Sequence, residues 1–237
     1  MDRIKIISIF KSIDGEAYNA GRPTVFLRTY GCNIRCSYCD TAESWSMQVH
    51  SERYKDPIRE LTPEAAAEEI VALAGATRHA TITGGEPLLP ENVPWMQELT
   101  ARLLAKGFCV DFETNGAVPL KDMAEWRESL HSLADRVRFI MDWKCPGSKM
   151  NAKMLPENLG YLTPMDVVKC VVMDEDFDEV LAVRARLDEA IPVYISPCFG
   201  QVTMSRIPDF VVAHDALNFK CQLQQHKVFY PVSAVNV

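Results

Sequence analysis

Short runs of apolar and β-branched residues recur along the chain, and polar segments that contain glycine separate them. Runs of this length and composition predict buried strands. The predicted strands cover residues 5–10, 24–29, 79–83, 108–112, 137–141, 166–173 and 192–195. Residues 12–17, with a glycine between two acidic residues, are predicted as a turn.

Two of the segments between the strands carry clear helix signals. Thr62 and the following proline predict the start of a helix over residues 63–73, and Gly75 predicts its end. Residues 94–106 have apolar side chains at helical spacing, and Gly107 follows as a stop signal.

The remaining segments are less regular. Two further helices are predicted over residues 121–133 and 176–189. Residues 43–57 are polar and aperiodic and are predicted as a loop, whereas residues 219–229 are predicted to be partly extended.

Strand, loop and helix alternate several times, which predicts an α/β protein with a mainly parallel sheet. About six such units are present instead of eight, so we expect an incomplete TIM-like barrel. The chain of 237 residues has no internal repeat or linker, and residues 1–237 are predicted to form a single domain. The polar and glycine motifs follow strand ends, where ligands bind in open sheets and barrels alike.

Composition narrows the classes of partner. Hydrophobic residues make up 48% of the chain, charged residues make up 24%, and the net charge is −7, so a nucleic-acid partner is not expected. No apolar run reaches 18 residues, so no membrane-spanning helix is expected. The apolar run that ends at Phe10 is too short for a signal peptide, and we expect a cytoplasmic protein.

The chain has eight cysteines, which we expect to be reduced thiols. Cys32, Cys36 and Cys39 form a C-x3-C-x2-C motif. A structural zinc site needs four ligands, and His50, the nearest histidine, has no second ligand at the spacing of a zinc knuckle. A [4Fe–4S] cluster takes four thiolates, so three cysteines leave one iron open to an exchangeable ligand. Of the other cysteines, Cys109, Cys170 and Cys221 are expected to be small buried hydrophobic residues. Cys145 and Cys198 are set apart from this expectation, because they lie in segments at predicted strand ends.

The three-cysteine motif resembles the signature of the radical S-adenosylmethionine (SAM) superfamily, including the aromatic Tyr38 before the last cysteine. The resemblance implies that the amino and carboxylate groups of SAM chelate the fourth iron. Residues 84–87 read Gly-Gly-Glu-Pro after a predicted strand, and glycines there allow close approach to the backbone. This segment resembles the superfamily's GGEP motif, which meets the SAM amino group.

Further segments, in the same order along nearly the whole chain, resemble the 7-carboxy-7-deazaguanine synthase family. These are residues 12–16, Arg28, 31–33, 39–41, 83–87, 113–116 and 226–227. The family usually reads Gln-Gly-Glu-Gly where this chain has Asp14-Gly15-Glu16-Ala17. The glutamate is kept, and the first and last residues differ.

The resemblance implies a metal and substrate-carboxylate site. Cys32, Cys36 and Cys39 would hold the [4Fe–4S] cluster. Thr41 would offer its hydroxyl to a Mg2+ ion that also binds the carboxylate of the substrate. Arg28 would grip that carboxylate in a planar pair.

The resemblance also implies two sets of ligand contacts. The pterin substrate would meet Ile13, Asp14, Gly15, Glu16, Arg28, Thr83 and His226, with Glu16, Arg28 and His226 expected to be catalytic. SAM would meet Tyr38, Cys39, Asp40, Gly85, Glu86, Asn115, Asp142, Trp143, Lys144, Ser196, Pro197, Cys198 and Phe199.

The implied reaction is a radical-mediated ring contraction. A one-electron donor such as flavodoxin reduces the cluster, SAM is cleaved, and the 5′-deoxyadenosyl radical abstracts a hydrogen from 6-carboxy-5,6,7,8-tetrahydropterin. Rearrangement and loss of ammonia give 7-carboxy-7-deazaguanine, a precursor of queuosine and other 7-deazapurines. The family is typically homodimeric.

Two alternatives remain open at the level of sequence. A glycyl-radical activase, also a radical SAM enzyme, shares an Asp-Gly pair before the cysteines, as at residues 14–15. That class usually continues with proline where this chain has Glu16, and it lacks the Asp-Thr pair at residues 40–41. A non-enzymatic metal-binding module is the more distant alternative, which the GGEP segment disfavours.

Overall fold

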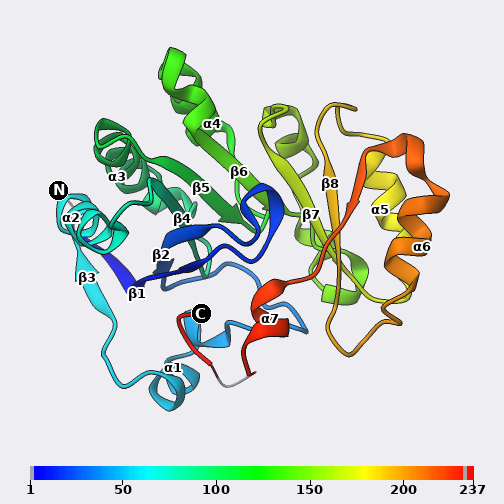
Figure 1. Cartoon of the computed structure of the whole chain (residues 1–237), viewed down its shortest axis with the longest axis horizontal. Helices are drawn as coiled ribbons and strands as arrows, with labels where there is room; N and C mark the ends of the chain where they lie inside the picture. The colour runs from blue at the N-terminus through cyan, green and yellow to red at the C-terminus, as the bar shows by residue number, and fades with distance from the viewer. Residues whose placement is uncertain (1–2, 232–233) are drawn as a thin grey trace.

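The computed structural model describes residues 3–231 and 234–237. Within them, a single curved sheet has the strand order β3-β1-β2-β4-β5-β6-β7-β8-β9 (Figure 1). The strands are β1 (Ile4–Ile13), β2 (Pro23–Thr29), β3 (Arg59–Leu61), β4 (His79–Gly84), β5 (Cys109–Thr114), β6 (Val137–Asp142), β7 (Val167–Val172), β8 (Val193–Pro197) and β9 (Phe219–Cys221). The helices are α1 (Met47–Arg53), α2 (Pro63–Ala74), α3 (Val93–Ala105), α4 (Lys121–Ser129), α5 (Phe177–Arg184), α6 (Arg206–Ala213) and α7 (Gln225–Phe229).

Neighbouring strands from β2 to β9 all pair in parallel, whereas β1 pairs antiparallel with both β2 and β3. The sheet ends at β3 on one side and at β9 on the other, and these edge strands do not pair with each other. The predicted α/β class and incomplete barrel are therefore confirmed. No helix in the described part of the chain is long and apolar enough to span a bilayer.

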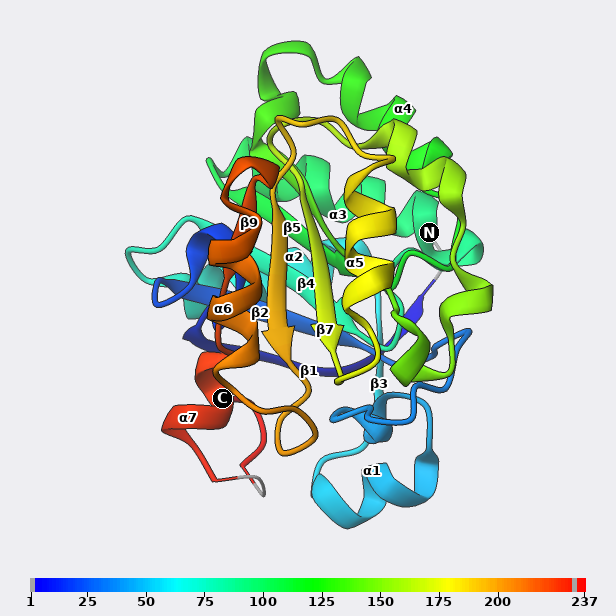
Figure 2. The same ribbon diagram turned by 90° about the vertical axis from the view of Figure 1, so that its right-hand side faces the viewer.

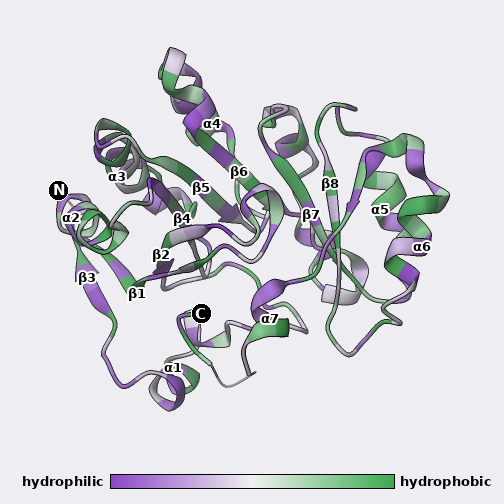
Figure 3. Ribbon diagram, viewed as in Figure 1, coloured by the Kyte–Doolittle hydropathy of each residue, from purple (hydrophilic) through white to green (hydrophobic). Residues whose placement is uncertain are grey.

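Alternate residues of the parallel strands point to opposite faces of the sheet. The outward face is apolar and packs against α2, α3, α4, α5 and α6 in the main core. Figure 2 shows α5 and α6 beside β7 and β8, and Figure 3 shows the apolar residues along β5, β7 and α5. The main core includes, for example, Leu27, Ile82, Phe112, Met141 and Cys170.

The inward face of the same strands carries most of the polar residues. Arg28 on β2 lies opposite Thr83 on β4, and Asp142 on β6 lies opposite Lys169 on β7. These side chains alternate with the outward apolar ones, so the strand period places the chemistry inside the open barrel.

Several predicted boundaries are wrong. The predicted loop 43–57 contains α1, which the sequence pattern does not reveal because His50 is its only buried residue; Ser46 caps it by accepting from Val49 N. The predicted turn 12–17 is partly wrong because β1 continues to Ile13.

The predicted helix 121–133 ends early, at Ser129, and His131 adopts a left-handed φ of 51°, which a continuing helix does not allow. The predicted helix 176–189 ends at Arg184, whose guanidinium donates to the carbonyls of Leu187 and Ile191 in the following turn. Residues 219–229 are extended only in β9, and their last part forms α7.

All eight cysteines are free. Cys170 is buried, as predicted, and Cys145 and Cys198 are buried as well. The prediction is wrong for Cys221, which is exposed on the edge strand β9, and Cys109 is only half-buried.

Candidate active site

A cavity of about 1120 Å³ opens at the carboxyl ends of the parallel strands. Its wall combines segments that follow β2, β4, β5, β6 and β8 with inward residues of β7 and residues of the C-terminal segment around α7. Predicted site residues in its lining are Ile13, Gly15, Glu16, Arg28, Cys32, Cys36, Tyr38, Cys39, Asp40, Thr41, Thr83, Gly85, Asn115, Asp142, Lys144, Cys198, Phe199 and His226.

Gly84, the last residue of β4, and Gly85 after it hold the cysteine loop against the sheet. A Cβ on Gly85 would lie 1.8 Å from the carbonyl oxygen of Gly31, and one on Gly84 would lie 2.3 Å from Thr29 N, so neither position accepts a side chain. Glu86 N donates to the Gly31 carbonyl over 2.7 Å. The loop that begins the cysteine motif is thus fixed by direct backbone contact with the GGEP segment.

Glu86 lies behind the cavity wall. Its carboxylate is fully buried and accepts from Leu88 N over 2.9 Å, Thr114 Oγ1 over 2.8 Å and Asn115 N over 2.6 Å. Burial raises the pKa of Glu86 to about 7, although these hydrogen bonds oppose the increase. Glu86 therefore joins the loops that follow β4 and β5.

Cys32, Cys36 and Cys39 all face the cavity. Burial raises the pKa of Cys32, and it raises the pKa of Cys36 to about 11 against the charge of Lys144. Thiols with raised pKa values need a bound cation to become the thiolate ligands of a metal. Three free thiols on one cavity therefore fit a metal centre with thiolate ligands.

His50 does not complete a zinc site with these cysteines. It lines a separate cavity of about 510 Å³ between α1 and the segment before β3, where Nε2 lies 3.2 Å from the carbonyl oxygen of Asp56. Within the described residues, no histidine or acidic group forms a compact ligand cluster with the three thiols. The geometry thus disfavours the zinc knuckle.

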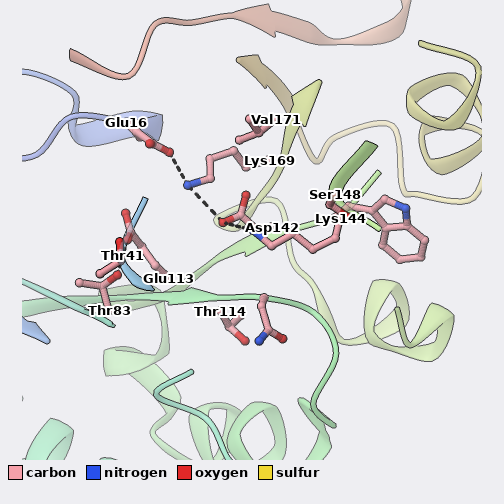
Figure 4. Close-up of polar contacts among 12 residues, drawn as sticks. Glu16, Thr41, Thr83, Glu113, Thr114, Asp142, Lys144, Ser148, Lys169 and Val171 are labelled. Carbon is pink, nitrogen blue, oxygen red and sulfur yellow. Dashed lines mark hydrogen bonds and ion pairs between the residues drawn. The ribbon is translucent and has the colours of Figure 1, made fainter. Parts of the chain in front are cut away.

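Lys169 is the central charged group on the inner wall (Figure 4). Its ammonium pairs with Glu16 and lies 3.4 Å from Asp142 Oδ2, and Asp142 also pairs with Lys144 over 3.1 Å. Burial lowers the pKa of Lys169, but the charges of Asp142, Glu16 and Glu113 outweigh burial and hold the pKa well above its usual value. Lys169 therefore stays charged.

Glu113 lies on the same wall, at the end of β5. Its carboxylate accepts from Thr83 Oγ1 over 2.5 Å. Burial raises the pKa of Glu113, against the charge of Lys169. Thr83 and Glu113 consequently form a partly buried polar pair between Arg28 and Lys169 in the order of the sheet.

Arg28 has no acidic partner within 4 Å among the residues that the structure describes. Its guanidinium lies 5.9 Å from the centre of the Phe10 ring, and its buried Nε makes no hydrogen bond. Thr41 also faces the cavity and donates from Oγ1 to Asp40 Oδ1 over 2.9 Å, which leaves its oxygen lone pairs available. An uncompensated guanidinium in a cavity is suited to an anionic ligand.

His226 reaches the cavity from α7. A Cβ on Gly15 would lie 3.1 Å from His226 Nδ1, so the glycine permits close packing of the two segments. His226 Nε2 lies 4.0 Å from Asp40 Oδ2. These contacts place the histidine between the loop after β1 and the cysteine loop.

Some predicted residues lie outside the cavity lining. Glu86 and Asp14 support the wall from behind, and Trp143 Nε1 donates outward to Glu179 over 2.8 Å. Ser196 is buried and accepts from Gln222 Nε2 over 3.0 Å, and Pro197 follows it at the end of β8.

Asp14 lies below the cavity. Oδ1 accepts from Glu16 N, and Oδ2 accepts from Thr81 Oγ1, each over 3.1 Å. Burial and the charge of Glu113 raise the pKa of Asp14 to about 7. His79 and Asp111 lie beside it, within 4.8 Å between ligand atoms, but Arg138 pairs with Asp111 over 2.7 Å, so this group is a salt-bridge network.

The sequence predictions missed Lys169 and assigned no role to Glu113, Gln224 and Lys227, although Glu113 and Lys227 belong to the family-like segments 113–116 and 226–227; all four line the cavity. Lys169 had a usable signal, because a lysine within the valine-rich run 167–172 interrupts an otherwise buried strand. Gln224 and Lys227 lie in a segment that resembles the family motif around His226, but their contacts depend on how the C-terminal segment folds back.

Comparisons with known proteins indicate the class of protein to which this chain belongs. The Radical SAM superfamily profile matches residues 26–143. QueE from Escherichia coli has a similar fold, with a TM-score of 0.64 at 22% identity over 93% of this chain and 94% of that chain. SuiB from Streptococcus suis, bound to its precursor peptide, has a TM-score of 0.58 at 12% identity and covers 82% of this chain and 47% of that chain. The fold and the three-cysteine cavity define a radical SAM protein.

Curated relatives narrow this class. The 7-carboxy-7-deazaguanine synthase of Clostridium acetobutylicum is 31% identical over 95% of this chain and 96% of that relative. The protein of the same name from Methanospirillum hungatei is 34% identical over 94% of this chain and 84% of that relative. The chain belongs to the 7-carboxy-7-deazaguanine synthase family.

Proposed function

We propose that this protein converts 6-carboxy-5,6,7,8-tetrahydropterin to 7-carboxy-7-deazaguanine with loss of ammonia. The observation that carries the proposal is the convergence of Cys32, Cys36 and Cys39 with Arg28 and Glu16 on one cavity. The thiols suit an iron–sulfur cluster, the guanidinium suits a carboxylate, and the glutamate suits an amide and amino edge.

The cysteine motif would hold the [4Fe–4S] cluster. The cluster and SAM together supply the one-electron chemistry that starts the reaction, and the protein supplies binding and orientation. Asn115 lies at the rim of the cysteine loop, with Nδ2 3.7 Å from Cys32 Sγ and 2.8 Å from Asn33 Oδ1. Its amide would therefore orient both the first cysteine and the adjoining part of SAM.

Several cavity residues would form the rest of the SAM site. Tyr38 is fixed by a hydrogen bond from its hydroxyl to the Val171 carbonyl over 3.1 Å, which holds the cysteine loop against β7. The buried Oδ1 of Asp142 makes no hydrogen bond within the described residues and is free to accept from a ligand. The other contacts would come from Asp40, Gly85, Lys144, Cys198 and Phe199.

The substrate carboxylate would lie between Arg28 and Thr41. Arg28 supplies a permanently charged planar donor, and its lack of an acidic partner in the described residues leaves it free for this role. The Thr41 hydroxyl would bind Mg2+, a hard cation that prefers oxygen ligands and that would also take the substrate carboxylate.

The polar edge of the pterin would meet Glu16 and the backbone of residues 13–15. The contact from Asp14 would be indirect, because its carboxylate fixes Glu16 N and does not line the cavity. Thr83 on β4 and His226 on α7 would complete the pocket. In this arrangement Glu16 and His226 would be positioned to hold or move protons on the substrate.

The product assay tests this proposal. Protein reconstituted anaerobically with iron and sulfide would be incubated with SAM, a reductant, Mg2+ and carboxytetrahydropterin. We expect 7-carboxy-7-deazaguanine from the native protein and from a Cys221→Ala control, because Cys221 is exposed away from the cavity. A variant with Cys32, Cys36 and Cys39 all changed to alanine should give none. Absence of product from the native protein would rule out the proposed reaction.

The remaining parts of the proposal concern the surroundings of the enzyme. We propose that it acts in the cytoplasm as a homodimer and takes electrons from a small donor such as flavodoxin. Free thiols throughout the chain fit a reducing compartment. The dimer and the donor rest on resemblance to the family.

A further inference from the structure

The short helix α7 lies at the carboxyl-terminal edge of the sheet, beside the C-terminus (Figure 1). It has five residues and none of them is buried, and its apolar residues Val228 and Phe229 are 57% and 64% exposed. A helix this short is not stable by itself, and burial of apolar surface does not hold this one. Its position must therefore depend on polar contacts.

One set of contacts joins the segment to the loop after β1. Gln225 N donates to the Gly15 carbonyl over 3.2 Å, and Gln224 Nε2 donates to Glu16 Oε1 over 2.7 Å. These bonds hold His226 against Gly15. They fix one end of the segment relative to the proposed pterin contacts.

The second set passes through Lys227. Its Nζ donates to Gln224 Oε1 over 2.7 Å and pairs with Asp40 Oδ2 over 2.8 Å. Asp40 in turn accepts from the Thr41 hydroxyl over 2.9 Å. A continuous polar chain therefore runs from Thr41 through Asp40, Lys227 and Gln224 to Glu16.

An isolated ion pair at a surface contributes little to stability. Lys227 differs because its side chain is only 23% exposed. It also connects two segments of the cavity lining, the cysteine loop at Asp40 and the C-terminal segment at Gln224. Its two acceptors lead to different parts of the proposed substrate site, the Mg2+ and carboxylate side at Thr41 and the pterin side at Glu16. Losing the ammonium would leave α7 joined to the cysteine loop only by the longer contact of His226 Nε2 with Asp40 Oδ2, at 4.0 Å.

We propose that Lys227 is a positioning residue that fixes α7, and with it His226, relative to Asp40 and Glu16. The role rests on the proposed function for the identity of the ligand, but the connection itself is a property of the protein alone. Lys227 would thereby set how tightly the pterin is bound, without contacting the reacting atoms.

The first test is hydrogen exchange on the protein without Mg2+, SAM or substrate. Lys227→Met should speed exchange of the Lys227 and Tyr230 amides, which donate to Gln224 O and His226 O, by about fivefold or more. The control Lys220→Met changes an exposed lysine on β9 and should leave these amides unchanged. Equal exchange in Lys227→Met and the native protein would overturn the proposal.

A double-mutant cycle tests the partner. Asp40→Asn and Lys227→Met should have less than additive effects on exchange, because both remove one connection. Lys227→Arg should restore slow exchange, since arginine keeps the charge and has several donors. Additive effects, or no difference between arginine and methionine, would contradict the role of the Lys227–Asp40 pair.

Kinetics test the functional part. Lys227→Met should raise KM for carboxytetrahydropterin about tenfold and change kcat less than about twofold, as expected for lost binding common to substrate and transition state. A fall in kcat at constant KM would contradict a positioning role. If the native protein makes no product, the proposed function fails, while the exchange results still decide whether Lys227 fixes α7.

Discussion

Lys169 forms an ion pair with Glu16 that joins the middle of β7 to the loop after β1. Both side chains are almost completely buried, and Asp142 lies 3.4 Å from the same ammonium. Register explains the second contact, because Asp142 and Lys169 are paired on neighbouring parallel strands. Glu16, a proposed substrate contact, thus depends on Lys169, which also contacts Asp142 on the inner wall of the cavity.

Replacing Lys169 should lower the free energy of unfolding. Lys169→Met would leave the buried carboxylates of Glu16 and Asp142 without their shared cation, and we expect a loss of about 3–5 kcal/mol in the free energy of unfolding. Urea unfolding followed by circular dichroism measures it. The double variant Lys169→Met/Glu16→Gln should lose less than the sum of the two single changes. A loss below about 1 kcal/mol for Lys169→Met would contradict the buried pair.

The position of Asp14 predicts a pH dependence of stability. Its pKa rises from 3.8 to about 7 on folding, chiefly through burial, so the folded protein holds a proton that the unfolded chain releases in this range. The stability linked to this proton is complete below about pH 4 and is lost as pH rises through about 7.

Asp14→Asn isolates that contribution from other groups, such as Glu86, that titrate in the same range. We compare the free energy of unfolding of the variant with that of the native protein. The difference, variant minus native, should be larger at pH 8 than at pH 5 by on the order of 1 to 3 kcal/mol. Asparagine retains an acceptor for Glu16 N, so the turn is kept. A stability difference that does not vary with pH would show that Asp14 does not hold this proton.

Arg28 should recognise the carboxylate of the substrate. The native protein should bind carboxypterin at least about tenfold more tightly than the same pterin without its carboxylate, in line with a charge-assisted pair. In the absence of Mg2+, which would also take the carboxylate, Arg28→Met should bind both weakly and equally, whereas Arg28→Lys should keep part of the preference. Isothermal titration gives the three ratios. Retained preference in Arg28→Met would place the carboxylate elsewhere.

Thr41 should set the response to Mg2+. Thr41→Val removes the hydroxyl at similar size, and the Mg2+ concentration for half-maximal activity should rise about tenfold. Thr41→Ser keeps the oxygen and serves as the matched control, with a change below about threefold. An identical Mg2+ response in all three proteins would exclude Thr41 as a ligand.

The sequence predicted most of the sheet and the residues at strand ends, because both leave local patterns. It predicted the cysteine motif and the GGEP segment, but not that the glycines are required by contact with Gly31 and Thr29. That requirement arises from the ends of β2 and β4, where the residues in contact are 54 and 55 positions apart in the sequence, and it has no local signature. Lys169 could have been predicted as a cavity residue, because its inward position follows from the strand period once β7 is identified.

The contacts within the C-terminal part of the site could not be predicted from local sequence patterns. His226 was predicted from the family motif, but the helix that presents it has no buried face to give a periodic pattern. Gln224 and Lys227 act through residues about 200 positions earlier, and only the folded chain brings them together. Asp14 was predicted as a substrate contact, and its position behind Glu16 follows from its bond to Thr81.

The central claim is that the cavity supports ring contraction of a carboxypterin. Its most direct test incubates the reconstituted native protein with carboxytetrahydropterin, SAM, a reductant and Mg2+. Mass spectrometry then measures 7-carboxy-7-deazaguanine, and an enzymatic assay measures ammonia. We predict that both products form in equal amounts. Cleavage of SAM to 5′-deoxyadenosine with neither deazaguanine nor ammonia would contradict the claim.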